Sequence, residues 1–516
     1  MVSPTMSADI SAHRDYIERI LRAKVYDVAI ESPLDLATRL SRRLDNRIEL
    51  KREDLQPVFS FKLRGAYNKI ATLSSQVASR GVICASAGNH AQGVALAASR
   101  RGIPSVIVMP ITTPQIKVSA VRDLGGEVVL HGDDYDSAYE HALCLAQDRN
   151  LVFVHPFDDP DVIAGQGTIG MEIARQTGGD IDAVFIPVGG GGLLAGIAVY
   201  LKYLYPRIRI IGVNAADSTA MHDSLASGSR VKLARVGIFA DGVAVRRVGE
   251  ETFRLARDLV DEMMLVTTDE ICAGIQDIFE DTRSIVEPAG ALAVAAIKKY
   301  VAREKCSGKR LIAINCGANM NFDRLRHVAE RAEVGAHREA LLAVEIPEQP
   351  GSFLNLCRAL GARSVTEFNY RFDQQDRARV FLGFATATGD GERLQMIEHL
   401  QKAGYRVTDM TDNELAKLHI RYMVGGRPSG LVDELLLRFE FPERPGALTR
   451  FLEAIGSRWN ISLFHYRNHG SDAGRVLAGI QVAPHSRADF FEHLAALQYP
   501  WIDETGNRAY RLFLGG

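Results

Sequence analysis

"AVFIPVGGGGLLAGIAVYL", residues 183–201, is the stretch of sequence that decides the fold. Its 19 residues carry no charge, which by length alone would suffice for a helix that crosses a membrane. However, Pro187 and the four glycines at 189–192 would break such a helix near its start. The apolar run before the glycines and the longer apolar run after them therefore predict a buried strand, a tight turn and a buried helix.

The same alternation of strand and helix continues over the first 325 residues or so. Most of the strand candidates are separated by 10 to 20 residues of amphipathic pattern, as in "TPQIKVSAVRDLGG" (113–126). Several are apolar on both faces, which is typical of parallel strands covered by helices on each side. We therefore predict a doubly wound α/β body whose strands lie at 81–86, 105–110, 127–132, 151–156, 183–188, 209–214 and 310–315.

The glycines in "VGGGGLLAG" (188–196) are candidates for an anion site. Without side chains, consecutive backbone N–H groups can converge, and the start of a helix adds partial positive charge, so one phosphate could bind there. The alternatives are a packing turn or a dinucleotide fingerprint. The fingerprint fits poorly, because the third glycine is misplaced and Asp217 stands at the wrong end of its strand for a ribose.

"VFSFKLRGAY" (58–67) places Lys62 in an apolar run. One interpretation is a surface lysine whose stem lies on the core while its amine reaches water. The other is a lysine kept neutral to form a Schiff base. Arg64 either keeps the local field positive or pairs with an acid on the surface. A Schiff-base lysine together with a site for one phosphate suggests pyridoxal 5′-phosphate, an aldehyde that carries one phosphate.

Three more polar positions lie where predicted strands end or helices begin. In "SAGNHAQG" (86–93), Ser86 and Asn89 could hold a carboxylate and a ring hydroxyl, or could simply begin a helix. Cys316 follows a strand and could be functional or merely buried. Glu287 precedes a proline and could be an ordinary acid at a helix start.

The composition argues against several classes of protein. The formal net charge of −2 offers no basic surface for nucleic acid and no polybasic membrane anchor. The six cysteines include no CxxC pair, which favours reduced thiols in the cytoplasm over disulfides or a zinc site. The first 20 residues lack an apolar signal core and carry three acids. We therefore expect a cytoplasmic protein with no metal, nucleic-acid or membrane site.

After about residue 335 the sequence repeats itself. "LLAVEIPEQPGSFLNLCRALG" (341–361) resembles "LLLRFEFPERPGALTRFLEAIG" (435–456), and "FNYR" (368–371) recurs as "FHYR" (464–467). Two motifs in the same order at nearly one offset indicate a duplicated α+β domain. "MVGGRPSG" (423–430) between the copies is typical of a linker. The predicted domains are a body at 1–330 and two copies at 338–411 and 433–505.

The motifs "SFKLRGAY", "SAGNHAQG", "PVGGGGLLAG", "EPAGA" and "CGANMNF", with the doubled tail, resemble the biosynthetic threonine dehydratases (threonine ammonia-lyases). These are pyridoxal-phosphate enzymes of fold type II, whose body is similar to the β subunit of tryptophan synthase, with two ACT-like domains. The resemblance covers the chain from about residue 15 to its end. Ala289 departs from the serine of relatives, which leaves the contribution of that position open.

The resemblance implies a role for each matching residue. Lys62 would carry the cofactor and serve as the catalytic base, Asn89 would bond the ring oxygen, and Cys316 would face the pyridine nitrogen. A thiol there would favour β-elimination over transamination, because it cannot keep that nitrogen protonated. The phosphate would bind Gly189, Gly190, Gly191, Gly192 and Leu193, and the substrate would bind Ser86, Gly88, Asn89 and His90.

The implied reaction is dehydration and deamination of L-threonine to 2-oxobutanoate and ammonia, the first step of isoleucine biosynthesis. L-Serine is a second candidate substrate, and a homotetramer is expected. Isoleucine would inhibit through the ACT-like pair and valine would oppose it; alternatively, the tail only builds the oligomer. Two rival functions are a serine-preferring dehydratase or β-replacing synthase of the same fold, and a non-catalytic amino-acid-binding regulator.

Overall fold

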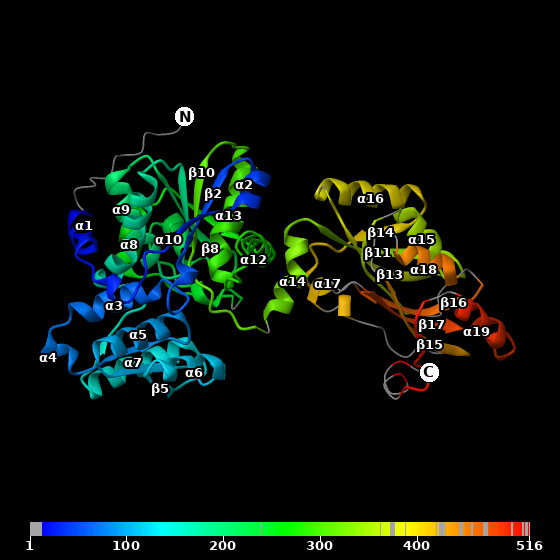
Figure 1. Cartoon of the computed structure of the whole chain (residues 1–516), viewed down its shortest axis with the longest axis horizontal. Helices are drawn as coiled ribbons and strands as arrows, with labels where there is room; N and C mark the ends of the chain where they lie inside the picture. Colours follow the sequence, from blue (N-terminus) through cyan, green and yellow to red (C-terminus); the bar gives the residue numbers. More distant parts are fainter. Residues whose placement is uncertain are drawn as a thin grey trace. The chain divides into compact units, whose positions relative to one another are not determined.

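The structure is a computed structural model, and the chain divides into two compact units, Met1–Ala332 and Glu333–Gly516 (Figure 1). The N-terminal segment, most of the linker 423–430 and the second Pro-Gly pair (445–446) fall outside the described residues. The structure describes residues 13–516 apart from 238, 323, 362, 372–376, 388, 419, 423–427, 429, 443–446, 456–457, 468–472, 497–498, 508–509, 511–513 and 515–516.

A six-stranded sheet forms the larger half of the first unit. All its neighbouring strands are parallel except the first pair, and Figure 1 shows α8 and α9 on one side of the sheet and α12 and α13 on the other. The strand order is β1 (Leu34–Leu36), β2 (Arg47–Arg52), β10 (Arg310–Asn315), β7 (Ala183–Pro187), β8 (Arg209–Ala215) and β9 (Glu262–Val266).

Fourteen described α-helices begin in the first unit, and the last of them, α14, continues past the end of that unit at Ala332. They are α1 (Arg14–Leu21), α2 (Thr38–Leu44), α3 (Lys62–Thr72), α4 (Ser75–Ala78), α5 (Asn89–Arg101), α6 (Gln115–Asp123), α7 (Tyr135–Asp148), α8 (Pro160–Thr177), α9 (Gly192–Leu204), α10 (Ala220–Ser227), α11 (Glu250–Leu259), α12 (Thr268–Thr282), α13 (Pro288–Glu304) and α14 (Arg324–Gly335). Short 3₁₀ turns lie at η2 (Val25–Asp27), η3 (Glu53–Leu55) and η4 (Asp241–Val243).

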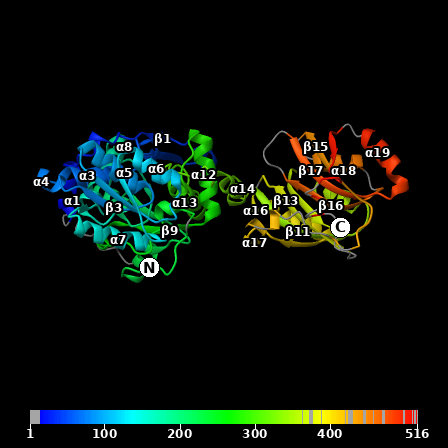
Figure 2. The ribbon, with the colours of Figure 1, turned by 90° about the horizontal axis from the view of Figure 1, so that it is seen from below.

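A separate four-stranded parallel sheet forms the smaller half, in the order β5 (Glu127–Leu130), β4 (Ser105–Met109), β3 (Val82–Ala85) and β6 (Val152–Phe153). Figure 2 shows its helices α5, α6 and α7 around β3. Val82 and Cys84 pack toward α5, while Ile83 and Ala85 pack toward α7, so this strand is buried on both faces as its apolar sequence predicts.

All seven predicted strands exist, and they are divided between two sheets. Three further strands, β1, β2 and β9, were not predicted. In β2, "RIELKR", charged residues are buried through ion pairs, so its sequence lacks the apolar character of the others. Among the described helices, none is long and apolar enough to cross a membrane.

In the second unit, two β-α-β-β-α-β copies share one eight-stranded sheet, in the order β14-β11-β13-β12-β16-β17-β15-β18. The copies meet where β12 pairs with β16, so "FNYR" lies antiparallel to "FHYR". The first copy comprises β11 (Glu339–Pro347), α15 (Ser352–Leu360), β12 (Val365–Arg371), β13 (Arg377–Ala385), α16 (Asp390–Lys402) and β14 (Arg406–Asp409), followed by α17 (Glu414–Leu418) and η5 (Ile420–Tyr422). The second comprises β15 (Glu434–Pro442), α18 (Ala447–Ile455), β16 (Asn460–Arg467), β17 (Ala473–Gln481), η6 (Pro484–Ser486), α19 (Arg487–Ala496) and β18 (Trp501–Asp503). Helices α15, α16, α18 and α19 pack into a single core with the strands.

Candidate active site

Lys62 is the first residue of α3, and the loop before it is fixed to the end of β10. Ser60 forms an isolated antiparallel bridge with Gly317, and the Phe61 N–H donates to the Cys316 carbonyl at 3.3 Å. Phe59 has a φ of 54°, a left-handed conformation that costs energy for a residue with a side chain. These contacts place the Lys62 backbone beside the carboxyl end of a central strand, where open α/β sheets bind ligands.

The Lys62 amine has the environment of a base. The side chain is partly buried, and Nζ donates to the Pro156 carbonyl at 3.1 Å. Burial lowers its pKa from 10.5 to about 8, although the nearby Cys316 and Glu287 act to raise it. A substantial fraction of this amine is therefore neutral near physiological pH, unlike that of an exposed lysine.

Arg64 fits neither sequence-based alternative. Its guanidinium is fully buried rather than on the surface, and no effect of its charge on Lys62 is found. It donates to Glu53 at 2.8 Å and to Glu172 at 2.6 Å, and Glu172 also pairs with the buried Lys51 at 2.7 Å. Two cations and two anions therefore balance within this cluster, beside the first turn of α3.

Close backbone contacts hold the same turn of α3. A Cβ on Gly93 of α5 would lie 3.1 Å from the Leu63 nitrogen, and one on Gly165 of α8 would lie 2.7 Å from the Arg64 carbonyl oxygen. Glycine is thus required at both positions for the helices to approach this closely. These contacts hold the backbone at Lys62 rigidly, so its side chain starts from a fixed position.

Gly189, Gly190, Gly191 and Gly192 form the turn between β7 and α9. In the described part of the chain, none of their N–H groups donates to another backbone or side-chain group in a loop or turn. A Cβ on Gly190 would lie 2.2 Å from the Phe157 ring, and Gly191 has a φ of 99°. The glycines therefore leave a run of backbone donors at a helix start, which suits a phosphate.

The lysine and the glycine turn meet through residues 156–157. The Pro156 carbonyl accepts the bond from Lys62, and the next residue, Phe157, packs against Gly190 and Gly192. Thr252 supports the turn from the other side, since its hydroxyl donates to the Gly190 carbonyl at 2.6 Å. Sequence reasoning missed Phe157 and Thr252, because neither stands in a motif.

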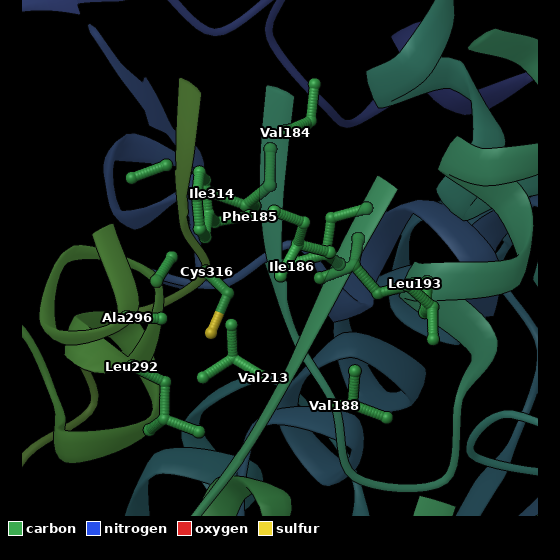
Figure 3. Close-up of a cluster of buried hydrophobic side chains, with 14 of the residues drawn as sticks. Val184, Phe185, Ile186, Val188, Leu193, Val213, Leu292, Ala296, Ile314 and Cys316 are labelled. Carbon is green, nitrogen blue, oxygen red and sulfur yellow. The ribbon is translucent and has the colours of Figure 1, made fainter. Parts of the chain in front are cut away.

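Cys316 lies directly after β10 and is almost completely buried. Figure 3 shows its sulfur in a cluster with Val213, Leu292 and Ala296. Burial raises the pKa of its thiol well above the ordinary value, so the thiol stays protonated at neutral pH. A neutral thiol can bond a ring nitrogen but cannot hold a positive charge there as a carboxylate would.

Asn89 is the first residue of α5 and is bonded on both sides of its amide. Its Nδ2 donates to Glu287 Oε1 at 2.7 Å, and its Oδ1 accepts from Asn319 Nδ2 at 2.7 Å. Glu287 is buried and does not cap its own helix, α13. The sequence contained these residues in motifs, but nothing local indicated that residues 198 positions apart would bond.

The three other predicted substrate contacts lie at the turn from β3 into α5. Gly88, not Ser86, is the N-cap of α5, and the Gly88 N–H donates to Ser86 Oγ at 3.2 Å, so the alternative of an N-cap serine is wrong. The His90 ring is within 2.9 Å of the Val154 carbonyl, and burial lowers its pKa to about 3. His90 can therefore offer a substrate its backbone N–H at the helix start, but not a charge.

These groups fit pyridoxal phosphate. The backbone donors at 189–192 suit its phosphate, the low pKa of Lys62 suits its aldehyde, and the protonated thiol of Cys316 suits its pyridine nitrogen. Leu193, the second residue of α9, adds its backbone N–H to the donors at the helix start. Among the described residues, no three His, Cys, Asp or Glu side chains gather as the ligands of a metal would.

Comparisons with known proteins agree with this chemistry. The family model described as "Pyridoxal-phosphate dependent enzyme" matches residues 25–317. The model described as "C-terminal regulatory domain of Threonine dehydratase" matches twice, at 330–420 and 425–514. The biosynthetic L-threonine dehydratase of Burkholderia multivorans is 56% identical over 98% of this chain and 100% of its own length.

Two further proteins with similar sequences carry the same kind of name. The biosynthetic L-threonine dehydratase of Escherichia coli is 53% identical over 97% of both chains. Among solved structures, the processed form of threonine deaminase isoform 2 from Solanum lycopersicum is 52% identical with a TM-score of 0.63. That match covers 65% of this chain and 92% of the solved one.

Proposed function

Because this chain belongs to the threonine dehydratase family of pyridoxal-phosphate-dependent enzymes, we propose that it converts L-threonine to 2-oxobutanoate and ammonia. Threonine loses its Cα proton and its β-hydroxyl, which leaves as water. The product enamine then takes up water and releases ammonia, so the net products are 2-oxobutanoate and ammonia. This reaction is the first step of isoleucine biosynthesis.

The residues divide the work of this reaction. Bound pyridoxal phosphate supplies an aldehyde that condenses with amines and a ring that accepts electrons from the Cα–H bond. Lys62 would hold the cofactor at rest, and its neutral amine, once free, would take the Cα proton. Its pKa of about 8 supports this role, because a lysine at 10.5 would be almost wholly protonated.

Cys316 bears on which reaction follows proton removal. Its protonated thiol can bond the ring nitrogen without charging it, since burial holds the pKa of the thiol high. With Cys316 as its partner, the ring would withdraw electrons from Cα less strongly than with a carboxylate there. Early departure of the β-hydroxyl is then favoured over transfer of the proton elsewhere.

The observation that carries the proposal is that Lys62, whose amine has a low pKa, and the glycine turn at 189–192 lie against two adjacent residues. The Lys62 amine bonds the Pro156 carbonyl, and the glycine turn packs against Phe157. The test is borohydride reduction of the purified protein, followed by peptide mapping. We expect the label on Lys62, and its loss in Lys62→Ala but not in Lys69→Ala, a lysine of the same helix. A label on another residue, or none in the wild type, would refute the cofactor assignment.

Product analysis then tests the substrate. Threonine should give 2-oxobutanoate with a higher kcat/KM than serine gives pyruvate. A preference for serine would instead support the rival serine dehydratase. A colourless protein without activity on either amino acid would support a non-catalytic regulator.

We further propose that isoleucine binds the tail and lowers activity, and that valine opposes it. A small cleft between the two copies supports this placement of the effector. Its lining combines polar groups with aliphatic and aromatic side chains, as binding of an aliphatic amino acid requires, and is made by Gln349, Pro350, Gly351, Phe353, Leu354, Leu452, Trp459, Asn460 and Ile461. Coupling between such sites is typically about 1–3 kcal/mol.

Replacing Leu354 with tryptophan would fill this cleft. We expect the full-length variant to keep its activity without effector and to lose most of its inhibition by isoleucine. If the Leu354→Trp variant remains as sensitive to isoleucine as the wild type, the cleft is not the effector site.

The proposal also covers the oligomeric state, the location in the cell and the domain bounds. We propose a homotetramer, to be tested by sedimentation, and a cytoplasmic location, which the free state of all six cysteines supports. We also propose domains at 1–330, 338–411 and 433–505, supported by the repeated order of elements. Limited proteolysis that cuts first inside these ranges would contradict the domain assignment.

A further inference from the structure

Glu287 is a buried carboxyl group that does not serve its own helix. It is the N-cap residue of α13, yet its side chain accepts no capping bond, and it is only 4% exposed. A short acid such as aspartate at this position usually bonds the free N–H groups of the first turn. Here Oε1 accepts instead from Nδ2 of Asn89, on another helix, at 2.7 Å.

The orientation of the Asn89 amide follows from its neighbours. Asn319 Nδ2 lies 2.8 Å from the Val58 carbonyl, which can only accept, so that atom of Asn319 must be the nitrogen. It also lies 2.7 Å from Asn89, whose atom there must therefore be the oxygen. The Asn89 nitrogen then faces Glu287, which provides the required acceptor.

This arrangement leaves Asn89 with one free donor. An amide nitrogen carries two protons, and Glu287 accepts a hydrogen bond from one of them. Gly93, four residues further along the same helix, touches the backbone of Lys62, so the start of α5 lies beside the cofactor-bearing lysine. Glu287 is the only acceptor found for this nitrogen among the described residues, so the second proton is available to a ligand bound beside Lys62.

We propose that Glu287, together with Asn319, is a positioning residue that holds the Asn89 amide so that its second proton serves the cofactor ring. The inference rests on the proposed function, since it requires that pyridoxal phosphate bind here. Without an acceptor at 287, the amide could rotate and present its oxygen to the ring oxygen, which would repel it.

The role requires an acceptor rather than a charge. Burial and the charge of Asp241 together raise the pKa of Glu287 to about 7, against the opposing effects of the bond from Asn89, the charge of Lys117 and a bond from the Asn319 backbone. Lys62 and Cys316 face the same carboxyl group. Whether ionised or protonated, the group keeps an oxygen able to accept from Asn89, so its orienting effect does not depend on its charge.

The test compares Glu287→Gln with Glu287→Met in the full chain. Glutamine keeps an accepting oxygen, whereas methionine has a similar length without one. We expect methionine to raise the dissociation constant of pyridoxal phosphate and lower kcat by about 5- to 150-fold, the effect of one lost buried hydrogen bond. It should also shift the visible absorbance of the bound cofactor, while glutamine should stay within about threefold of wild type.

A second variant keeps the inference testable if the methionine variant folds poorly. Asn319→Leu should reproduce the loss of affinity and the spectral shift. Combining it with Glu287→Met should add little, because both act through Asn89, whereas independent structural damage would multiply. Glu250→Met, an exposed acid in the first turn of α11, is the matched control and should change nothing.

Two outcomes would overturn the inference. One is that Glu287→Met has the cofactor affinity and the visible spectrum of the wild type. The other is a Gln variant as impaired as the Met variant, which would show that charge, not the acceptor, matters. Failure of the proposed function itself is distinct, because the wild type would then bind no pyridoxal phosphate.

Discussion

Replacing Glu172 with glutamine should destabilise the first turn of α3, and with it the backbone that carries the Lys62 side chain. Glu172 is fully buried and faces two cations, Lys51 at 2.7 Å and Arg64 at 2.6 Å. Although burial acts to raise the pKa of Glu172, the charges of Arg64 and Lys51 hold it below its ordinary value. Glutamine has nearly the same shape but leaves two buried cations facing Glu53 alone.

The magnitude follows from the burial of every partner. Removing one member of a buried ion pair typically costs about 3–5 kcal/mol, because it leaves an uncompensated charge. Removing a cation as well, in Lys51→Met with Glu172→Met, restores the balance of charge. We expect this double variant to be more stable than the sum of the single effects predicts, by about 1–3 kcal/mol.

Hydrogen exchange measured by mass spectrometry is the suitable assay. Both tryptophans, at 459 and 501, lie in the second unit, so their fluorescence would report the wrong part of the chain. Slowly exchanging amides of α3 and α8 should exchange about two to four orders of magnitude faster in Glu172→Gln. Glu127→Gln, which removes an exposed pair with Arg149, should change the same peptides by tenfold at most.

The dependence of stability on pH provides a second check. Because the folded pKa of Glu172 lies below its unfolded value of about 4.5, its contribution is fully present above that pH. It is lost as the pH falls through the folded value, and Glu172→Gln should lack this part of the acid sensitivity. Exchange in α3 and α8 no faster than in the Glu127→Gln control would refute the reasoning.

Three further predictions concern the cofactor site. Gly190→Ala would place a Cβ 2.2 Å from the Phe157 ring and should weaken pyridoxal phosphate binding at least about tenfold in equilibrium dialysis, whereas Gly391→Ala, with open space around it, should not. The rate should rise with pH and level off above about 8, where Lys62 becomes neutral, so a pH-independent rate would contradict its role as base. Cys316→Asp should increase transamination, measured as pyridoxamine phosphate, and an unchanged product ratio with the cofactor still bound would count against the role of the thiol.

The sequence predicted the strands of the body better than their pairing. Apolar runs identified seven strands, and five of these are buried on both faces, which requires such runs. Their division into two sheets depends on which strands pair, and periodicity carries no information on partners. The strand β2 was missed because Lys51 and Arg52 are buried through ion pairs that only the folded chain supplies.

For the site, motifs identified residues but not their relations. The glycine turn and Lys62 could be named because their chemistry is local: missing side chains, and an amine in an apolar run. The part played by Glu287 could not, since its partner Asn89 is 198 residues away and its own position is that of an ordinary helix cap. Arg64 was misjudged for the same reason, because both of its carboxylates come from distant segments.

Lys62 and Arg64 stand two residues apart on one helix, yet the fold treats their charges in opposite ways. Arg64 is surrounded by two carboxylates, which keep its charge and confine it within a neutral cluster. Within the described part of the chain, Lys62 pairs with no carboxylate: its amine bonds a carbonyl, and Glu287, whose charge acts to raise its pKa, is itself drawn toward neutrality by burial. A carboxylate paired with Lys62 would have raised its pKa and removed the base. The neutral amine at 62 is therefore a consequence of where the acids are placed, and the fold places them around its neighbour.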